Sequence, residues 1–97
     1  MKTFTESEIT NYITQQLKDW KLENNSLRRD FKFKNFVDAF SFMTAIALEA
    51  EKADHHPDWS NSYNKVSIAF ATHSEKGITQ LDYDLAGKTN ALYKRFI

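Results

Sequence analysis

The chain contains one proline and two glycines among 97 residues, and this scarcity constrains its fold more than any other feature. Proline and glycine are the strongest local breakers of helices and strands. The elements must therefore be joined by short polar turns, such as Asn24-Asn25-Ser26, because asparagine tolerates left-handed backbone angles. No linker, repeat or low-complexity segment interrupts the sequence, so residues 1–97 are expected to form one domain.

Two segments in the first half have helix signals. Thr5 and Glu8 form a capping-box pattern ahead of apolar residues at helical spacing, which predicts a helix over about residues 6–18. Asn35 fits the cap of a second helix that runs to about Ala53. This second helix has the wide apolar surface of a central helix. We assign one of its stripes to the core: Phe36, Phe40, Met43, Ala47 and Ala50.

The end of the second helix and the start of a third can also be located. Pro57 disfavours helical geometry at His56, so the second helix is expected to end near residues 54–55. Thr79 is followed three residues later by Asp82, which predicts a capped final helix.

Four segments have the character of strands, at about residues 20–23, 27–33, 59–63 and 66–73. The element order is therefore α-β-β-α-β-β-α, and the two hairpins predict a four-stranded antiparallel sheet. We expect an α+β fold, a two-layer sandwich with three helices on one face of the sheet.

Composition narrows the classes of function. The formal net charge is zero, so nucleic-acid binding by charge is not expected. The chain has no cysteine, which excludes disulfides, thiolate catalysis and thiolate zinc sites. The N-terminus lacks a signal-type apolar stretch, and the longest apolar region, 36–50, is too short and too polar to span a bilayer. We expect a soluble cytoplasmic protein that does not bind membranes.

The aromatic content is high for so small a chain, with eight Phe, four Tyr and two Trp. A domain of this size buries only about 60–65% of the surface that its unfolded chain exposes. Part of the aromatic surface is therefore expected at a subunit contact or a ligand pocket, and a homo-oligomer is expected.

The only three histidines, His55, His56 and His73, come from two separate stretches. Imidazole both donates and accepts protons near neutral pH, so converging histidines suit general acid–base chemistry. A zinc site is the competing use of three histidines. It is disfavoured because consecutive histidines diverge in direction and because His-x-His and His-x₃-His spacings are lacking.

From about Trp20 to Ala86 the sequence resembles the pterin-4a-carbinolamine dehydratase family. The resemblance is carried by Phe31-x-Phe33-Lys34-x-Phe36, Glu51-Lys52-x-x-His55-His56-Pro57-x-Trp59-x-Asn61-x-Tyr63-Asn64-x-Val66-x-Ile68, Thr72-His73, Gly77-Ile78-Thr79, Asp82, Leu85 and Ala86. It implies the fold predicted above and an enzyme that removes water from 4a-hydroxytetrahydropterin, giving quinonoid dihydropterin for cofactor recycling. It implies no metal or organic cofactor, and it implies dimers or tetramers.

The resemblance also implies roles for individual residues. His55 and His73 match family histidines that do acid–base work, and His56 matches one that holds substrate and assists proton transfer; acid and base are not assigned. Residues expected to hold substrate or shape its pocket are Glu51, Pro57, Trp59, Asp82 and Trp20. Glu51 would neighbour His55 if the helix extended that far. Asp82 can also be explained as the cap of the final helix, and one residue can both cap the helix and take part in the site.

A binding module is the alternative function. Animal members of the family also serve as a dimerisation cofactor for a homeodomain transcription factor, through helix packing between subunits. Nothing in this sequence identifies such a partner, and a full set of matching site residues favours the enzyme. An aromatic amino-acid hydroxylase would be the functional partner that the enzyme implies.

Overall fold

The computed structural model describes all of residues 1–97. Its helices are α1 (Glu6–Gln16), α2 (Phe36–Ala53) and α3 (Gln80–Tyr93), and its strands are β1 (Lys21–Glu23), β2 (Ser26–Lys32), β3 (Asp58–Ser62) and β4 (Lys65–Phe70). Two short 3₁₀ turns, η1 (His73–Glu75) and η2 (Lys94–Phe96), flank α3. The predicted element order and the α+β class are confirmed.

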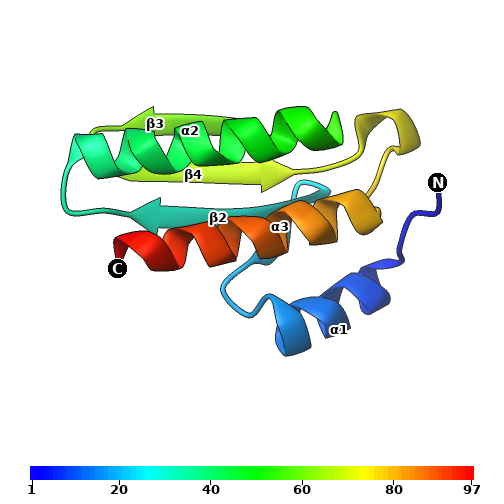
Figure 1. The fold of residues 1–97 in the computed structure, drawn as a ribbon. Coiled ribbons are helices and arrows are strands. Elements are labelled where there is room, and N and C mark those ends of the chain that lie inside the picture. Colours follow the sequence, from blue (N-terminus) through cyan, green and yellow to red (C-terminus); the bar gives the residue numbers. More distant parts are fainter.

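The four strands form one open antiparallel sheet in the order β1-β2-β4-β3. Leu27 of β2 lies opposite Phe70 of β4, and Trp59 of β3 lies opposite Ile68. Figure 1 shows α2 and α3 side by side over one face of the sheet, with α1 beside α3 and near the end that carries β1. No helix covers the opposite face of β2, β4 and β3 (Figure 1).

The helix ends follow the capping signals of the sequence. The Thr5 hydroxyl accepts from the Glu8 amide at 3.1 Å, and the Glu8 carboxylate accepts from the Thr5 amide at 2.8 Å. Asn35 Oδ1 accepts from the Asp38 amide at 2.8 Å at the start of α2. At the other end of α2, Asp54 adopts a left-handed conformation with φ of 51°, which stops the helix just before the histidine pair.

The core lies between the sheet and the helices and is rich in aromatic rings. Phe31 and Phe33 of the second-strand region pack against Phe42 of α2, with ring centroids 5.0 and 4.9 Å apart. Both rings also contact Tyr93 at the end of α3, edge to face. These aromatic contacts therefore pack α2 and α3 against β2.

The predicted core stripe of α2 is wrong for three of its five residues, Phe36, Phe40 and Ala47, which are exposed. Ala50 is buried as predicted, and Met43 is half-buried. Phe36 is 46% exposed and Phe40 is 54% exposed. Besides Ala50, the residues that α2 buries are Ala39, Phe42 and Ile46. Because α2 is apolar over a wide arc, helical spacing identified residues that share a face but not which face packs on the sheet.

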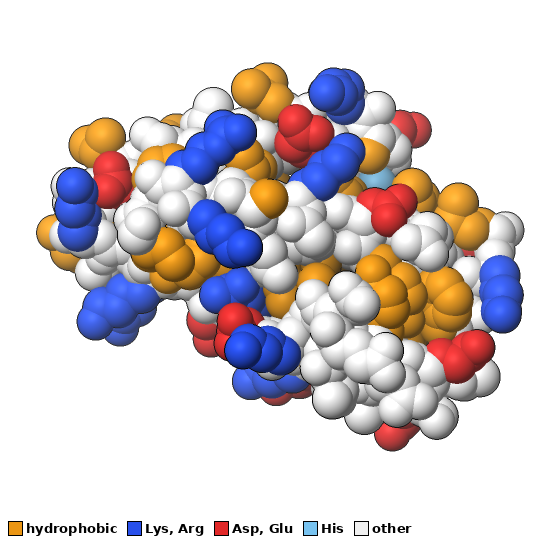
Figure 2. Space-filling view, turned by 60° about the horizontal axis from the view of Figure 1, so that its bottom comes forward, with side chains coloured by type: hydrophobic (Ala, Val, Ile, Leu, Met, Phe, Trp, Pro, Cys, Tyr) orange, Lys and Arg blue, Asp and Glu red, His pale blue; other side chains and the backbone are white.

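None of the helices is both long and apolar enough to cross a membrane. On the face turned forward in Figure 2, basic and acidic side chains are interspersed. This mixture agrees with the formal net charge of zero and leaves no single-sign field on that face.

Candidate active site around the three histidines

His55 lies directly after α2, and its ring is nearly buried. Its Nε2 lies 2.5 Å from Oδ1 of Asp82 at the start of α3, and its side chain is only 10% exposed. The backbone is fixed as well, because the His55 amide donates to the Ala50 carbonyl at 3.0 Å after the turn at Asp54. The imidazole is therefore held in one orientation against α3.

Asp82 is a fully buried carboxylate with three hydrogen-bond partners. Besides contacting His55, it accepts through Oδ2 from the Thr79 amide at 2.9 Å and from the Thr72 hydroxyl at 2.8 Å. A buried carboxylate needs such partners to offset its lost hydration. The bond to Thr79 confirms the predicted cap of α3, and the same carboxylate contacts a predicted catalytic imidazole.

His73 begins η1 and lies on the surface. Its Nε2 is 3.1 Å from Oδ2 of Asp58, the first residue of β3, and the two side chains are 73% and 71% exposed. An exposed pair of this kind contributes about 0–1 kcal/mol at most. Its main effect is to orient the ring of His73, whose chain neighbour is Thr72, the partner of Asp82.

His56 pairs with Glu51 across the end of α2. Nε2 of His56 lies 2.8 Å from Oε1 of Glu51, and both side chains are exposed. The expected contact between Glu51 and His55 required a helix that reached His55. Instead α2 ends at Ala53 and the left-handed Asp54 turns the chain, which brings the second histidine of the pair to Glu51.

The two histidine-bearing stretches are connected twice. One connection runs from His55 through Asp82 to Thr72, and the other is the direct pair of His73 and Asp58. In all three histidines the nitrogen beside a carboxylate is Nε2. Each ring therefore has Nδ1 left for another partner, and each has a carboxylate that orients it, the arrangement expected of a positioned acid or base.

The other predicted site residues are spread more widely. Trp59 is half-buried in β3 and shares a hollow with Phe40 of α2. Pro57 lies between the histidine pair and β3. Trp20 is a core residue, 2% exposed, whose indole N–H donates to Asn90 at 2.8 Å. This position gives no support to the prediction that Trp20 forms a wall of the substrate pocket.

The sequence reasoning missed two members of the contact network, Asp58 and Thr72. A hollow of about 170 Å³ lies beside His73 and is lined also by Thr72 and by Asn24 and Asn25 of the β1–β2 turn. Proximity of Asp58 to Pro57 in the chain was the only available signal, since the contact with His73 depends on how β3 pairs with β4. No group of three or more His, Cys, Asp or Glu side chains is placed to hold a metal ion.

Comparison with known proteins places these residues in context. The family model described as pterin 4 alpha carbinolamine dehydratase matches residues 2–92. A Brucella ovis protein, provisionally assigned as a pterin-4-alpha-carbinolamine dehydratase, is 49% identical over 90 residues, which cover 91% of this chain and 92% of the relative.

Two solved structures also resemble the fold. A Brucella melitensis protein described as a transcriptional coactivator/pterin dehydratase is 45% identical, with a TM-score of 0.89 over 95% of this chain and 99% of that one. A pterin dehydratase-like protein, identified as a RuBisCO assembly factor of the alpha-carboxysome, is 19% identical with a TM-score of 0.67, over 77% of this chain and 89% of its own. The second likeness shows the fold alone. From the family match and the identity to its named relatives, this chain belongs to the pterin-4-alpha-carbinolamine dehydratase family of hydro-lyases.

Proposed function

We propose that this protein dehydrates 4a-hydroxytetrahydropterin to quinonoid dihydropterin by general acid–base catalysis at its histidines. Family membership supports the carbinolamine dehydratase reaction. The histidine mechanism is supported above all by one observation: the buried bond between His55 and Asp82 continues to Thr72, the neighbour of His73.

The reaction needs two proton movements. The hydroxyl on the 4a carbon departs as water when a proton reaches its oxygen, and a ring N–H loses a proton as the new double bond forms. A well-placed acid or base contributes about 10²–10⁴-fold each. No covalent intermediate or redox partner is needed, since the elements of one water molecule leave the substrate.

We assign the acid and base roles to His55 and His73, each acting through Nδ1, with His56 holding substrate and assisting proton transfer. Asp82 and Asp58 orient the rings of His55 and His73. Glu51, Pro57 and Trp59 keep their proposed roles at the substrate. Asp82, which is fully buried, acts on the substrate through His55, and the proposed role of Trp20 has no support from its buried position.

The test is a stopped-flow assay of dehydration on chemically generated 4a-carbinolamine. His55→Ala and His73→Ala should each lower kcat by about 10²-fold or more, while the circular dichroism spectrum of His73→Ala stays unchanged because its ring is exposed. Lys52→Gln is the matched control, an exposed change at the end of α2. Wild-type rates in both histidine variants would refute the assignment.

We further propose that the product feeds a reductive recycling cycle in the cytoplasm, linked to an aromatic amino-acid hydroxylase. The chemistry supports this, because a 4a-hydroxy adduct is what a pterin-dependent hydroxylation leaves behind. A hydroxylase assay in which this protein raises the rate of cofactor turnover would test the link, with His73→Ala as the inactive control.

We propose a homo-oligomer, a dimer or a tetramer, in which copies pack through the outer face of α2. The support is its exposed apolar side chains, among them Phe36, Val37, Phe40 and Leu48. Isolated exposed apolar residues are ordinary, but four on one helix are typical of an interaction surface.

A non-catalytic dimerisation or transcription-cofactor module is the second candidate function. The description of the Brucella melitensis protein as a transcriptional coactivator favours it, as does the exposed apolar face of α2. The two functions separate experimentally, because a variant without histidines would lose the enzyme activity and keep the partner activity.

A further inference from the structure

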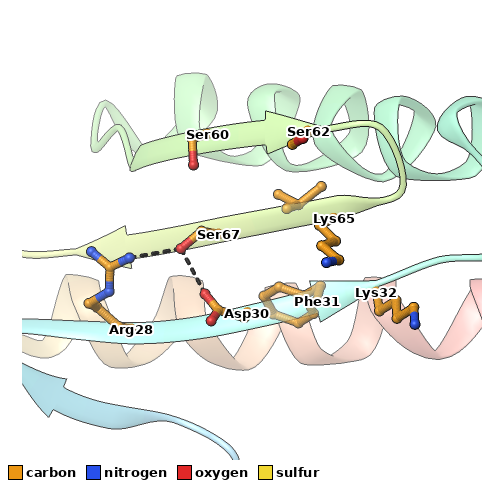
Figure 3. A pocket seen from close by; sticks show the side chains of 9 residues that line it. Arg28, Asp30, Phe31, Lys32, Ser60, Ser62, Lys65 and Ser67 are labelled. Atoms are coloured by element: carbon orange, nitrogen blue, oxygen red, sulfur yellow. Dashed lines mark hydrogen bonds between the residues drawn. The ribbon is translucent and has the colours of Figure 1, made fainter.

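The sheet face opposite the helices contains a polar hollow that the dehydratase reaction does not use. The hollow has a volume of about 430 Å³, within the usual range for small-molecule sites. Its side chains come from β2, β4 and β3, and Figure 3 shows them on the open side of the sheet. They include Arg28, Lys32, Ser62, Lys65 and Ser67.

One row of this hollow places two like charges together. In the strand register Lys32 of β2 lies directly opposite Lys65 of β4, and Lys65 lies directly opposite Ser62 of β3. Side chains at directly opposite positions are on the same face of a sheet, about 5 Å apart at Cβ, and like charges so placed are destabilising. Neither lysine forms an ion pair with any carboxylate of the chain.

Polar side chains next to the lysine row, from Arg28, Asp30 and Ser67, hydrogen-bond to one another, which the two lysines do not. Arg28 donates through Nη2 to the Ser67 hydroxyl at 2.8 Å, and that hydroxyl donates to Asp30 Oδ1 at 2.7 Å (Figure 3). Arg28 also pairs with Glu23 at 3.2 Å. Asp30 is the only carboxylate among the lining residues, against the three cations Arg28, Lys32 and Lys65, so the net charge of the lining is +2.

The backbone beneath the two lysines is held firmly. The Asn61 side-chain amide donates to the carbonyls of Tyr63 and Lys65, at 3.1 and 2.8 Å, which fixes the β3–β4 turn. The Lys32 carbonyl accepts from the Tyr93 hydroxyl at 2.8 Å. The positions from which both ammonium groups extend are therefore set before any ligand arrives, which lowers the entropy cost of binding.

We propose that Lys32, Lys65 and Ser62 bind a phosphate group of a small polar molecule on the open face of the sheet. A phosphate monoester has a charge of about −1.5 to −2 near neutral pH, which matches two ammonium groups. Lysine binds phosphate as a point charge, and the Ser62 hydroxyl can donate a further bond. The rest of the hollow, with Ser60 and Ser67, offers hydroxyls to the remainder of the molecule.

The test is calorimetric titration with inorganic phosphate and with ribose 5-phosphate, with sodium chloride held at matched ionic strength because salt alone screens the two lysines. Both probes should bind at the wild-type site, the ester more tightly because it also reaches the serines. Lys32→Gln and Lys65→Gln should each weaken binding about tenfold, the loss of one charged hydrogen-bond partner. Lys18→Gln, an exposed and unpaired lysine elsewhere, is the control.

Ligand-free stability gives a second readout. Both glutamine variants should melt at a slightly higher temperature than wild type, since each removes one of two repelling charges. Equal affinity in wild type and both variants would overturn the proposal, as would a loss of affinity in the Lys18→Gln control as large as that in Lys32→Gln and Lys65→Gln. The dehydration rate should not change in any of these lysine variants, so this test is independent of the histidine mechanism.

Discussion

At the scale of single residues, Asp82 has both a structural role and a proposed role in the chemistry. It caps α3 through Thr79, contacts Thr72 and orients His55, all from a fully buried position. The sequence identified Asp82 both as a cap and as a site residue. It could not pair Asp82 with His55, because a contact across 27 positions depends on how α2 and α3 pack.

Replacing Asp82 should therefore cost stability as well as activity. Asp82→Ala leaves the Thr79 amide and the Thr72 hydroxyl buried without this acceptor, so we expect a loss of about 2–4 kcal/mol in the free energy of unfolding. Urea denaturation followed by circular dichroism measures it. Asp84→Asn, an exposed change on the same helix, should stay within about 0.5 kcal/mol. A loss of similar size in both variants would contradict the role of Asp82.

At the scale of elements, capping patterns and apolar spacing predicted where the helices lie. They could not predict which face of α2 packs on the sheet or how segments far apart in the chain come into contact. Thr5 and Asn35 marked their helix starts correctly. The Phe36 and Phe40 stripe was assigned to the wrong face, because both sides of α2 are apolar and only packing on the sheet distinguishes them. Asp58 was missed as a partner of His73 for a related reason, since this contact joins the start of β3 to η1 and depends on how the chain turns after β4.

The contact between α1 and α3 contains a polar group without a partner. The ring of Tyr83 is stacked between Phe4 and Tyr12, with centroids 4.6 and 3.8 Å away, and its buried hydroxyl has no hydrogen-bond partner. Burial raises the pKa of Tyr83, with smaller contributions from the charges of Glu8 and Tyr12. The ionised form is thus disfavoured in the folded state.

Tyr83→Phe should stabilise the protein by up to about 1 kcal/mol near neutral pH, because it removes a buried unpaired hydroxyl. The raised pKa means that the folded state holds the phenol proton more tightly than the unfolded state. The stability that follows from this tighter proton binding is fully present below a pH of about 10, the usual pKa of tyrosine. It is lost as the pH rises through the pKa of Tyr83 in the folded state. Thermal melts from pH 8 to about pH 11 should show an alkaline loss that is smaller in Tyr83→Phe. The exposed Tyr63→Phe should follow wild type.

At the scale of the whole molecule, the sheet has one face packed against helices and one polar face, while α2 leaves apolar side chains outward. The 97-residue chain has limited buried surface of its own. Association through α2 would remove Phe36 and Phe40 from water, at roughly 25 cal/mol per Å² of apolar area. Composition predicted a surplus of aromatic surface, and the structure locates part of it on this helix.

Phe40→Glu should therefore shift the protein to a smaller species in size-exclusion chromatography with light scattering, because a charge at the centre of the contact opposes burial. Helical content should persist, since Phe40 is 54% exposed in the single chain. Gln15→Glu adds the same charge at an exposed polar position of α1, away from this contact, and should leave the oligomer intact. A wild-type protein that is monomeric at all concentrations would refute the contact.

Asp82 both caps α3 and orients His55, so its presence in a divergent relative can be explained by either role. A lineage that abandoned catalysis would still need this carboxylate to start α3, so its retention is poor evidence that chemistry survives. His73 is exposed and has one side-chain contact, with Asp58. Under the mechanism proposed above, His73 would be lost soon after selection for turnover ceased, because so little of the structure depends on it. It would then be the better marker for distinguishing working enzymes from repurposed scaffolds.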